Sequence, residues 1–284
     1  MFNQNIKSPV NIPVSKIHPF EGNPYKVLDN DEMNSLICSI QEQGILTPII
    51  IRPIENTDEY EVISGHRRLH AIVKAGIKEV PAFIYAVTRD EAAIMLVDSN
   101  LHREHILPSE KAFAYKLKLD AIKHQGKTSM QLAQKLSVEV VGESAGESKD
   151  NVRRYIRLTY LIPELLELVD EEKIALTPAV ELSYLTDEEQ YSLLGTIEEE
   201  DRTPSLSQAV RFKKLSQAGE LSDESIETIM QEDKANQKPT VKFSVERLQK
   251  VAPKVKESDL ENFVMKACEH YYRYLLRQRD RDSR

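Results

Sequence analysis

The chain of 284 residues has no tryptophan, only two cysteines and 6% aromatic residues. So low an aromatic content argues against a dense aromatic core. Cys38 and Cys268 fall on apolar faces of expected helices, which favours buried free thiols over a disulfide or a metal site. No stretch approaches the roughly 20 apolar residues of a membrane span, and the first residues lack the charged and then apolar pattern of a signal peptide. We therefore expect a cytoplasmic protein without a membrane partner.

Positive charge is scarce in one segment only. Residues 163–201 carry 13 acidic side chains and one basic side chain, whereas residues 91–162 carry 11 basic and nine acidic ones. The net charge of -8 at pH 7 and the pI of 5.5 therefore describe one acidic segment rather than the whole surface. They do not exclude a nucleic acid as the partner.

One short stretch has the composition of an anion site. At Ile63-Ser64-Gly65-His66-Arg67-Arg68 an alternating apolar pattern changes to a helical one. A glycine lets the backbone approach a ligand, the N–H groups at a helix start favour phosphate oxygens, and guanidinium groups donate charge-assisted hydrogen bonds. His66 either contacts the ligand or orients the turn. The alternative for the whole stretch is a solvated first turn with two surface arginines.

The first 90 residues predict a small mixed sheet. Strands are expected over residues 10–14, 49–51, 60–63 and 80–85, where apolar residues alternate or run together. Helices are expected over about residues 30–43 and 67–75, each followed by a glycine that can end it. This order places the anion stretch on a strand-to-helix turn, the geometry that presents backbone N–H groups to phosphate.

A second motif, Asn100-Leu101-His102-Arg103-Glu104, follows an expected helix that begins near Arg89. A Gly-x-Arg-Arg box followed by this second box resembles the ParB family of chromosome and plasmid partition proteins, which includes nucleoid-occlusion relatives. Residues 45–49 and 76–81 also resemble family segments, and the similarity covers about residues 10–215. The resemblance implies a fold of the α+β class that begins with a ParB/sulfiredoxin-like domain of mixed sheet, expected over residues 1–105.

In the family both boxes line a site for CTP with Mg²⁺. Carried over by position, the resemblance implies that nucleotide is held by Ser64, Gly65, His66, Arg67, Arg68, Asn100, His102, Arg103 and Glu104. One departure concerns the metal: Ser99 stands where the family's second box begins with glutamate, and a hydroxyl is a poorer magnesium ligand than a carboxylate. Asn100, together with a phosphate oxygen, stays the candidate metal ligand, and the chain is at most a slow CTPase.

An all-helical DNA-binding domain is expected over residues 106–231. A long helix over residues 108–123 precedes a short helix over residues 128–136, and the next helix, capped by Ser148, resembles the recognition helix of the family's helix-turn-helix. Nine extra residues, 137–145, lengthen the expected turn. Arginine and asparagine can read base edges, while lysine more often meets phosphate. The candidate DNA contacts are Thr128, Ser148, Lys149, Asn151, Arg153, Arg154 and Arg157; the alternative is a solvated helix face.

The C-terminal part is expected to be a linker followed by a helical module. Residues 232–240 have almost nothing to bury, and residues 241–284 contain a strand-like segment and a helix that begins at Ser258 or Asp259. Apolar residues between Leu260 and Leu276 form one stripe on this helix. So short a module cannot stabilise itself by burial, so the stripe either docks on the body or pairs with a second chain.

We therefore interpret the chain as a homodimeric, sequence-specific DNA-binding protein of the partition type, associated with the nucleoid. The resemblance implies a palindromic, centromere-like site on double-stranded DNA, closure as a dimeric clamp when CTP binds, and a ParA-like ATPase as partner. Two alternatives stay open. One, favoured by Ser99, is a helix-turn-helix transcriptional regulator without nucleotide switching. The other is an enzyme, since sulfiredoxin and some small-molecule kinases share the N-terminal fold, although Ser64 stands where sulfiredoxin's motif requires a cysteine.

Overall fold

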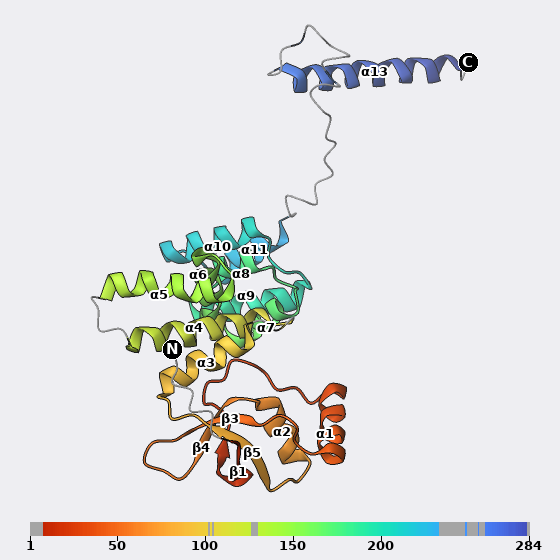
Figure 1. The fold of residues 1–284 in the computed structure, drawn as a ribbon. Helices are drawn as coiled ribbons and strands as arrows, with labels where there is room; N and C mark the ends of the chain where they lie inside the picture. Colours follow the sequence, from red (N-terminus) through yellow and green to blue (C-terminus); the bar gives the residue numbers. More distant parts are fainter. Residues whose placement is uncertain are drawn as a thin grey trace. The chain divides into compact units, whose positions relative to one another are not determined.

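Figure 1 shows the fold in a computed structural model that describes residues 8–101, 103, 105–125, 130–232, 248, 255 and 259–282. The chain divides into two units, Met1–Glu232 and Asp233–Arg284. The first unit holds a mixed sheet and then a succession of helices, which confirms the predicted α+β class. Residues 1–105 and 106–231, expected as separate domains, both fall in this first unit, so the boundary between them stays a prediction.

The sheet has five strands in the order β1-β5-β3-β4-β2. β1 pairs with β5 and β3 with β4 in antiparallel fashion, whereas β2 pairs with β4 and β3 with β5 in parallel, so the sheet is mixed as predicted. Four strands coincide with the expected ones; β2 was missed because two residues are too few to show a period. The five strands are β1 (Val10–Pro13), β2 (Ile17–His18), β3 (Ile49–Pro53), β4 (Tyr60–Ser64) and β5 (Glu79–Ile84).

Two helices pack on this sheet, α1 (Asp31–Gln43) and α2 (His66–Lys74). The Asn30 side chain accepts a hydrogen bond from the Met33 N–H and so caps α1, and Gly44 ends it at a φ of 73°. Buried apolar side chains from both helices and from the strands form one core. The two helices thereby fix the β4–α2 turn at the end of β4.

A second core joins the sheet to the helices that follow, α3 (Arg89–Asn100) and α4 (Pro108–Gln125). Thr88 and Glu91 form a capping box that starts α3. The core combines Phe20 and Tyr25 from the loop after β2 with apolar side chains of β4, α3 and α4. It therefore connects the expected nucleotide motifs to the helical part of the unit.

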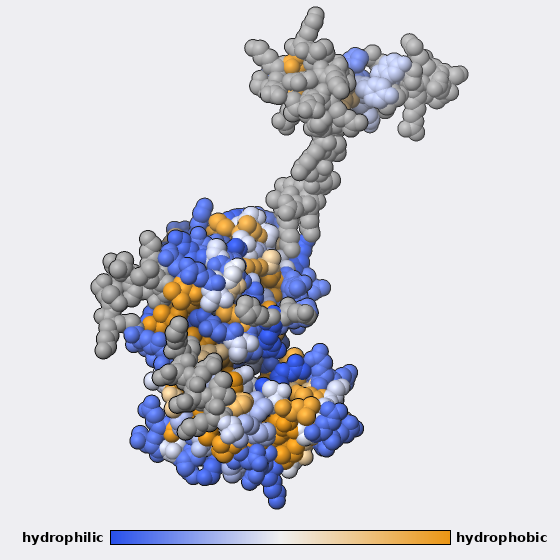
Figure 2. Space-filling model, viewed as in Figure 1, coloured by the Kyte–Doolittle hydropathy of each residue, from blue (hydrophilic) through white to orange (hydrophobic). Residues whose placement is uncertain are grey.

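Most of the remaining helices of the first unit pack around a third, larger core that includes Leu165, Leu193 and Phe212. Figure 2 shows hydrophilic side chains over most of the visible face of this unit, with separate apolar patches on the sheet and helical parts. The helices are α5 (Met130–Ala145), α6 (Lys149–Arg157), α7 (Pro163–Asp170), α8 (Leu176–Leu182), α9 (Asp187–Glu200), α10 (Leu206–Ala218) and α11 (Asp223–Gln231), with short 3-10 turns at Val14–Lys16 and Leu158–Tyr160.

The predicted long turn over residues 137–145 is wrong, because these residues continue α5 as helix. Val138 and Val141 are buried against Tyr115 of α4 and Val152 of α6, so packing overrides the low helix propensity of valine. The turn to α6 is only three residues long and begins at Gly146, with a φ of 66°. α5 and α6 thus form a helix-turn-helix pair with an unusually long first helix.

The described part of the second unit contains α13 (Leu260–Asp282), which confirms the expected terminal helix. Residues 233–240 of the expected linker and the strand-like residues 241–243 lie outside the described residues. Phe263, Tyr271 and Tyr274 are 40%, 61% and 49% exposed. No helix in the described part of the chain has the length and apolar composition needed to cross a bilayer.

Both cysteines are free, as expected, but the prediction that they are buried is wrong. Cys38 lies five residues beyond Met33 on α1, which places it about 140° around the helix from that buried side chain. Cys268 lies on α13, most of whose described side chains are exposed. Apolar spacing on one helix does not decide burial, because burial also requires a neighbouring element that covers that part of the helix.

Candidate functional site: an arginine-lined pocket and a helix-turn-helix pair

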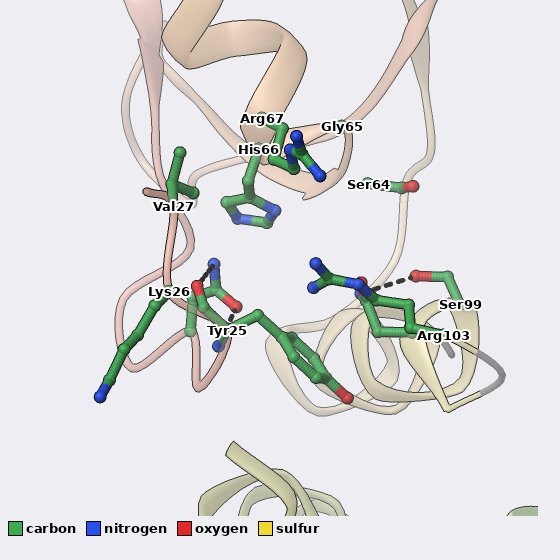
Figure 3. Close-up of a pocket in the computed structure, with 11 residues that line it drawn as sticks. Tyr25, Lys26, Val27, Ser64, Gly65, His66, Arg67, Ser99 and Arg103 are labelled. Carbon is green, nitrogen blue, oxygen red and sulfur yellow. Dashed lines mark hydrogen bonds between the residues drawn. The ribbon is translucent and has the colours of Figure 1, made fainter. Parts of the chain in front are cut away.

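A pocket of about 190 Å³ lies where the β4–α2 turn meets the end of α3 and the loop after β2 (Figure 3). This is smaller than the roughly 300 Å³ at the low end for small-molecule sites. The pocket therefore has room for one end of a nucleotide rather than for a whole one. Its lining residues are Asn23, Tyr25, Lys26, Val27, Ser64, Gly65, His66, Arg67, Ser99, Asn100 and Arg103.

Gly65 shapes the turn that forms one wall. Its φ of 105° lies in the left-handed region, and a Cβ atom there would come within 2.8 Å of Ile49 Cγ2 and 3.2 Å of Arg68 Nη2. No side chain of the described residues caps α2, so the N–H groups of its first turn are left for another acceptor. An uncapped helix start behind a glycine is suited to bind an anion, as the sequence predicted.

His66 is held by the loop opposite. Its Nε2 atom accepts a hydrogen bond from the Phe20 N–H at 3.3 Å, and burial lowers the pKa of the imidazole to about 4, against an opposing effect of Glu61. The ring is therefore neutral at pH 7, and because Nε2 accepts, we assign the proton to Nδ1. Of the two roles considered for His66, the structure shows the orienting contact directly, and the ring also lines the pocket.

Replacing His66 with glutamine should remove a pH dependence of stability. In the unfolded chain the imidazole takes up a proton near pH 6.5, whereas in the folded protein it does so only near pH 4. The unfolded state binds more protons between these values, so lowering the pH through this window destabilises the wild type, by about 2–3 kcal/mol at pH 4.5. The variant should lack this part of the decline.

Urea unfolding at pH 7 and pH 4.5 measures this difference. His124→Gln serves as control, because the His124 side chain is 70% exposed on α4. Parallel pH profiles for the wild type and His66→Gln would contradict the assignment of a buried neutral imidazole.

Two arginines approach the pocket from opposite sides. Figure 3 shows Arg103 pointing into the space from one wall, with Arg67 and His66 on the other. The Arg103 guanidinium lies 5.8 Å from the ring centre of Tyr25, a cation–π contact that orients it. Arg67 donates from Nη2 to Glu32 at 2.9 Å, but both side chains are exposed, at 41% and 73%, so this pair is weak. Both guanidinium groups are thus available to phosphate oxygens.

Arg68, one of the expected nucleotide contacts, is not among the residues that line the pocket. Its Nη1 atom donates to the backbone carbonyls of Thr47 and Pro48, at 2.5 and 2.8 Å. Burial lowers the pKa of its guanidinium. Because Arg68 is one residue further along α2, its side chain leaves the helix about 100° away from Arg67 and meets the α1–β3 loop instead. Arg67 is the arginine that faces Arg103.

The second motif contributes its helical end to the pocket. The Asn100 Nδ2 atom and the Ser99 hydroxyl both donate to the Leu96 carbonyl, at 2.8 and 2.9 Å. Asn100 therefore turns its amide nitrogen to the helix and lines the pocket with the rest of the group. His102 and Glu104, two of the expected nucleotide contacts, lie outside the described residues.

A magnesium ion does not fit the described side chains by themselves. No carboxylate is among the residues that line the pocket, and the described residues contain no group of three His, Cys, Asp or Glu side chains that could hold a metal. Mg²⁺ requires oxygen ligands in octahedral geometry and is often shared with substrate phosphates. Asn100 as a metal ligand stays a prediction.

Five of the pocket residues are not among the predicted contacts: Ser99, and four residues on the loop after β2. Asn23 and Tyr25 bond to each other through side chain and backbone, at 3.2 and 3.3 Å. Lys26 is tied to the helical part, because its N–H donates to Glu110 at 2.8 Å and its ammonium lies 3.3 Å from Asp170. The only sequence signal is the Pro19, Gly22 and Pro24 spacing, which marks a loop but no ligand.

The expected DNA contacts at and along α6 fall into two groups: exposed side chains, and side chains that are bonded within the protein. Ser148 caps the helix by accepting from the Asn151 N–H at 3.2 Å, as predicted. Ser148, Lys149 and Arg153 are exposed. Lys149 pairs with Glu139 at 3.4 Å and Arg153 with Asp150 at 3.1 Å. These exposed pairs contribute little energy and would give way to DNA phosphates.

The other candidates are engaged in the protein. Arg154 donates to the Thr177 hydroxyl at 2.6 Å, and Arg157 donates to Ser183 through Nε and Nη2, at 3.0 and 2.6 Å. The Arg157 guanidinium also lies between two tyrosine rings, 4.4 Å from Tyr160 and 3.9 Å from Tyr184. Asn151 bonds to Glu147. Arg154 and Arg157 thus fasten α6 to α8 and its end, and Thr128 lies outside the described residues.

Fold and site together define an α+β protein in which an arginine-lined pocket is joined to a helix-turn-helix pair. A family model described as ParB N-terminal domain matches residues 3–101. The chromosome-partitioning protein Spo0J of Thermus thermophilus is 32% identical over 202 residues, which cover 71% of this chain and 70% of that protein. The chain therefore belongs to the ParB family.

Other relatives match over a smaller share of their length. The nucleoid occlusion protein of Listeria innocua is 31% identical over 197 residues, or 69% of this chain and 65% of that protein, so the chain spans less than two thirds of this relative. Among solved structures, ParB of Caulobacter crescentus in complex with the centromeric parS site is 20% identical and covers 78% of this chain and 98% of that one, with a TM-score of 0.42.

Proposed function

We propose that the chain is a sequence-specific DNA-binding protein of the partition type that binds CTP in its N-terminal pocket and closes on DNA as a dimeric clamp. The observation that carries the nucleotide half is the meeting of two motifs, distant in sequence, at one pocket: Ser64 to Arg67 from one side, Asn100 and Arg103 from the other. Two guanidinium groups and an uncapped helix start supply donors for phosphate oxygens.

In this proposal the pocket residues have different roles in binding a triphosphate. The first N–H groups of α2, behind Gly65, bind phosphate oxygens, and Arg67 and Arg103 neutralise the charge from opposite walls. His66 stays neutral and keeps the turn against Phe20. Because the ligand bridges α2 and the end of α3, its binding favours one arrangement of these two helices. We propose Mg²⁺ only as a companion of the phosphates, with Asn100 as its one protein ligand.

The DNA half rests on α5 and α6. Ser148, Lys149 and Arg153 project from the start and exposed side of α6, the position from which a recognition helix enters the major groove. The relatives are named chromosome-partitioning and nucleoid occlusion proteins. By that likeness we propose a palindromic double-stranded DNA site, action on the nucleoid in the cytoplasm, and a ParA-like ATPase as partner.

The double substitution Lys149→Ala with Arg153→Ala should weaken DNA binding about tenfold at moderate salt and lower the slope of log affinity against log salt by about 2, since each phosphate contact contributes about 0.9. Binding measured at several salt concentrations gives both values. The matched control is Lys16→Ala with Lys173→Ala, which removes two other exposed, carboxylate-paired lysines. An unchanged slope would refute the assignment of α6.

Arg157→Ala should instead lower stability, because Arg157 is bonded within the protein.

Dimerisation is proposed for α13. Its described side chains include exposed Phe263, Met265, Tyr271 and Tyr274, an apolar and aromatic surface suited to a second copy. Sedimentation of the full chain and of a variant that ends at residue 232 tests this, and the truncated chain should be less dimeric. An equal dimer content in both would place the interface elsewhere.

The alternative is a transcriptional regulator that binds DNA without nucleotide switching, which Ser99 in place of a carboxylate favours. Selecting binding sites from random DNA with and without CTP, followed by calorimetric titration of CTP with and without the selected duplex, separates the two. CTP binding that depends on DNA supports the proposal, and no CTP binding in either condition leaves the regulator. Phosphotransfer turnover far above slow CTP hydrolysis would indicate the enzymatic alternative.

A further inference from the structure

A buried lysine connects the helix that ends at the pocket to the helix-turn-helix pair. Lys118 of α4 is 2% exposed. Its ammonium bonds to the Asp98 carboxylate of α3 and donates to the Ser144 hydroxyl of α5 at 2.6 Å. Three helices thus meet at one charged group.

Both partners of Lys118 occupy positions that matter to the proposed function. Asp98 immediately precedes Ser99 and Asn100, which line the pocket. Ser144 lies in the last turn of α5, four residues before the Ser148 cap of α6. The Ser144 hydroxyl donates to the Val141 carbonyl at 2.9 Å, so its oxygen is free to accept from Lys118.

We propose that Lys118 is the positioning residue that couples occupancy of the nucleotide pocket to the placement of the DNA-reading helix. This inference rests on the proposed function. It assigns no ligand contact to Lys118, which acts through Asp98 on one side and through Ser144 on the other.

The physical reason is that a buried ammonium cannot be left without its partners. A ligand that shifts the end of α3 also moves Asp98, and the Lys118 ammonium must move with Asp98 to keep the ion pair. Because α4 packs against α3, α5 and α6, a shift of Lys118 reaches Ser144 directly. The charged Lys118 side chain therefore couples Asp98 of α3 to Ser144 of α5 more strongly than an apolar side chain of the same length would.

A neighbouring contact shows why Lys118 rather than another lysine fulfils this role. Lys111, also on α4, pairs with Glu147 of the α5–α6 turn at 3.0 Å. Lys111 holds this turn, but no hydrogen bond joins it to α3 among the described residues. Only Lys118, among the described residues of α4, bonds to both α3 and α5.

Lys118→Met tests the inference, because methionine fills the space and Asp98 is 46% exposed, so water can solvate the freed carboxylate. The full chain is titrated with the selected duplex, without CTP and with saturating CTP. The ratio of the two DNA affinities measures the coupling, which spans about 5–150-fold in allosteric proteins. The ratio should fall to near 1 in the variant, while the affinities for CTP alone and for DNA alone stay within about threefold of the wild type.

Matched variants separate coupling from a general loss of structure. Lys123→Met removes another lysine from α4, one that pairs only with Asp120 of the same helix, and should keep the wild-type ratio. Ser144→Ala should lower the ratio as Lys118→Met does, and combining the two should add nothing. Ser144→Ala also decides the question should Lys118→Met fail to fold. A wild-type ratio in either variant would overturn the inference.

The outcomes also distinguish this inference from the proposed function. If the wild type binds CTP and DNA but independently, the coupling is overturned and both binding sites stand. If the wild type binds no CTP, the proposed function fails, and hydrogen exchange with DNA alone decides the link. DNA should then slow amide exchange at residues 96–101 in the wild type and not in Lys118→Met; no slowing in the wild type overturns the link.

Discussion

Replacing Gly65 with alanine is expected to lower the free energy of unfolding by about 2–5 kcal/mol and to abolish ligand binding in the pocket. Two effects add. The φ of 105° is strained for any residue with a Cβ, and the added methyl group would sit 2.8 Å from Ile49 Cγ2 in the sheet core. Since Ile49 is fully buried, the turn rather than the strand must move, and the first N–H groups of α2 leave their positions.

Gly76→Ala is the matched control for this prediction. Gly76 ends α2 with a φ of 70°, and nothing lies within 4 Å of the position of an added Cβ. The Gly76→Ala variant should lose only about 1 kcal/mol of the free energy of unfolding, from the strained backbone conformation. It should still bind CTP. Urea unfolding gives the stabilities and calorimetry the binding. Equal losses for the two variants would show that contact with Ile49 does not matter.

Arg103→Ala is expected to weaken CTP binding by about 10–100-fold with little loss of stability. A charge-assisted hydrogen bond contributes about 1.5–3 kcal/mol, and about 1.4 kcal/mol corresponds to a factor of ten. Among the residues that the structure describes, the Arg103 side chain contacts the Tyr25 ring and forms no hydrogen bond, so its removal leaves no buried partner there. Calorimetric titration with CTP measures the change, and Arg211→Ala, which removes an exposed arginine of α10 that does not line the pocket, is the control.

The same assay distinguishes the two arginines of the first motif. Arg67→Ala should resemble Arg103→Ala, because Arg67 lines the pocket and its pair with Glu32 is exposed. Arg68→Ala should mainly lower stability, because it leaves the Thr47 and Pro48 carbonyls without their donor. A larger loss of CTP affinity in Arg68→Ala than in Arg67→Ala would restore the original expectation from the family motif.

Much of the fold was predictable because its signals are local. Gly44 and Ser148 act within one turn of the chain, and each was predicted at a helix end and is found there. The spacing of apolar residues likewise predicted four of the five strands, and it predicted helices both beside the sheet and in the helical part of the first unit. The lengthened α5 was missed, because Val138, Val140 and Val141 disfavour helix until Tyr115 and Val152 bury two of them.

By itself the sequence determined the order of elements, the strand-to-helix turn at Gly65 and the presence of two arginine-bearing motifs, since each depends on residues close together in the chain. Only the tertiary structure decided which arginine faces Arg103, that Lys26 belongs to the pocket, and that Lys118 joins α3 to α5. These depend on which carbonyls, carboxylates and hydroxyls the packing of distant segments brings within reach of one side chain, and no short pattern of residues carries that information.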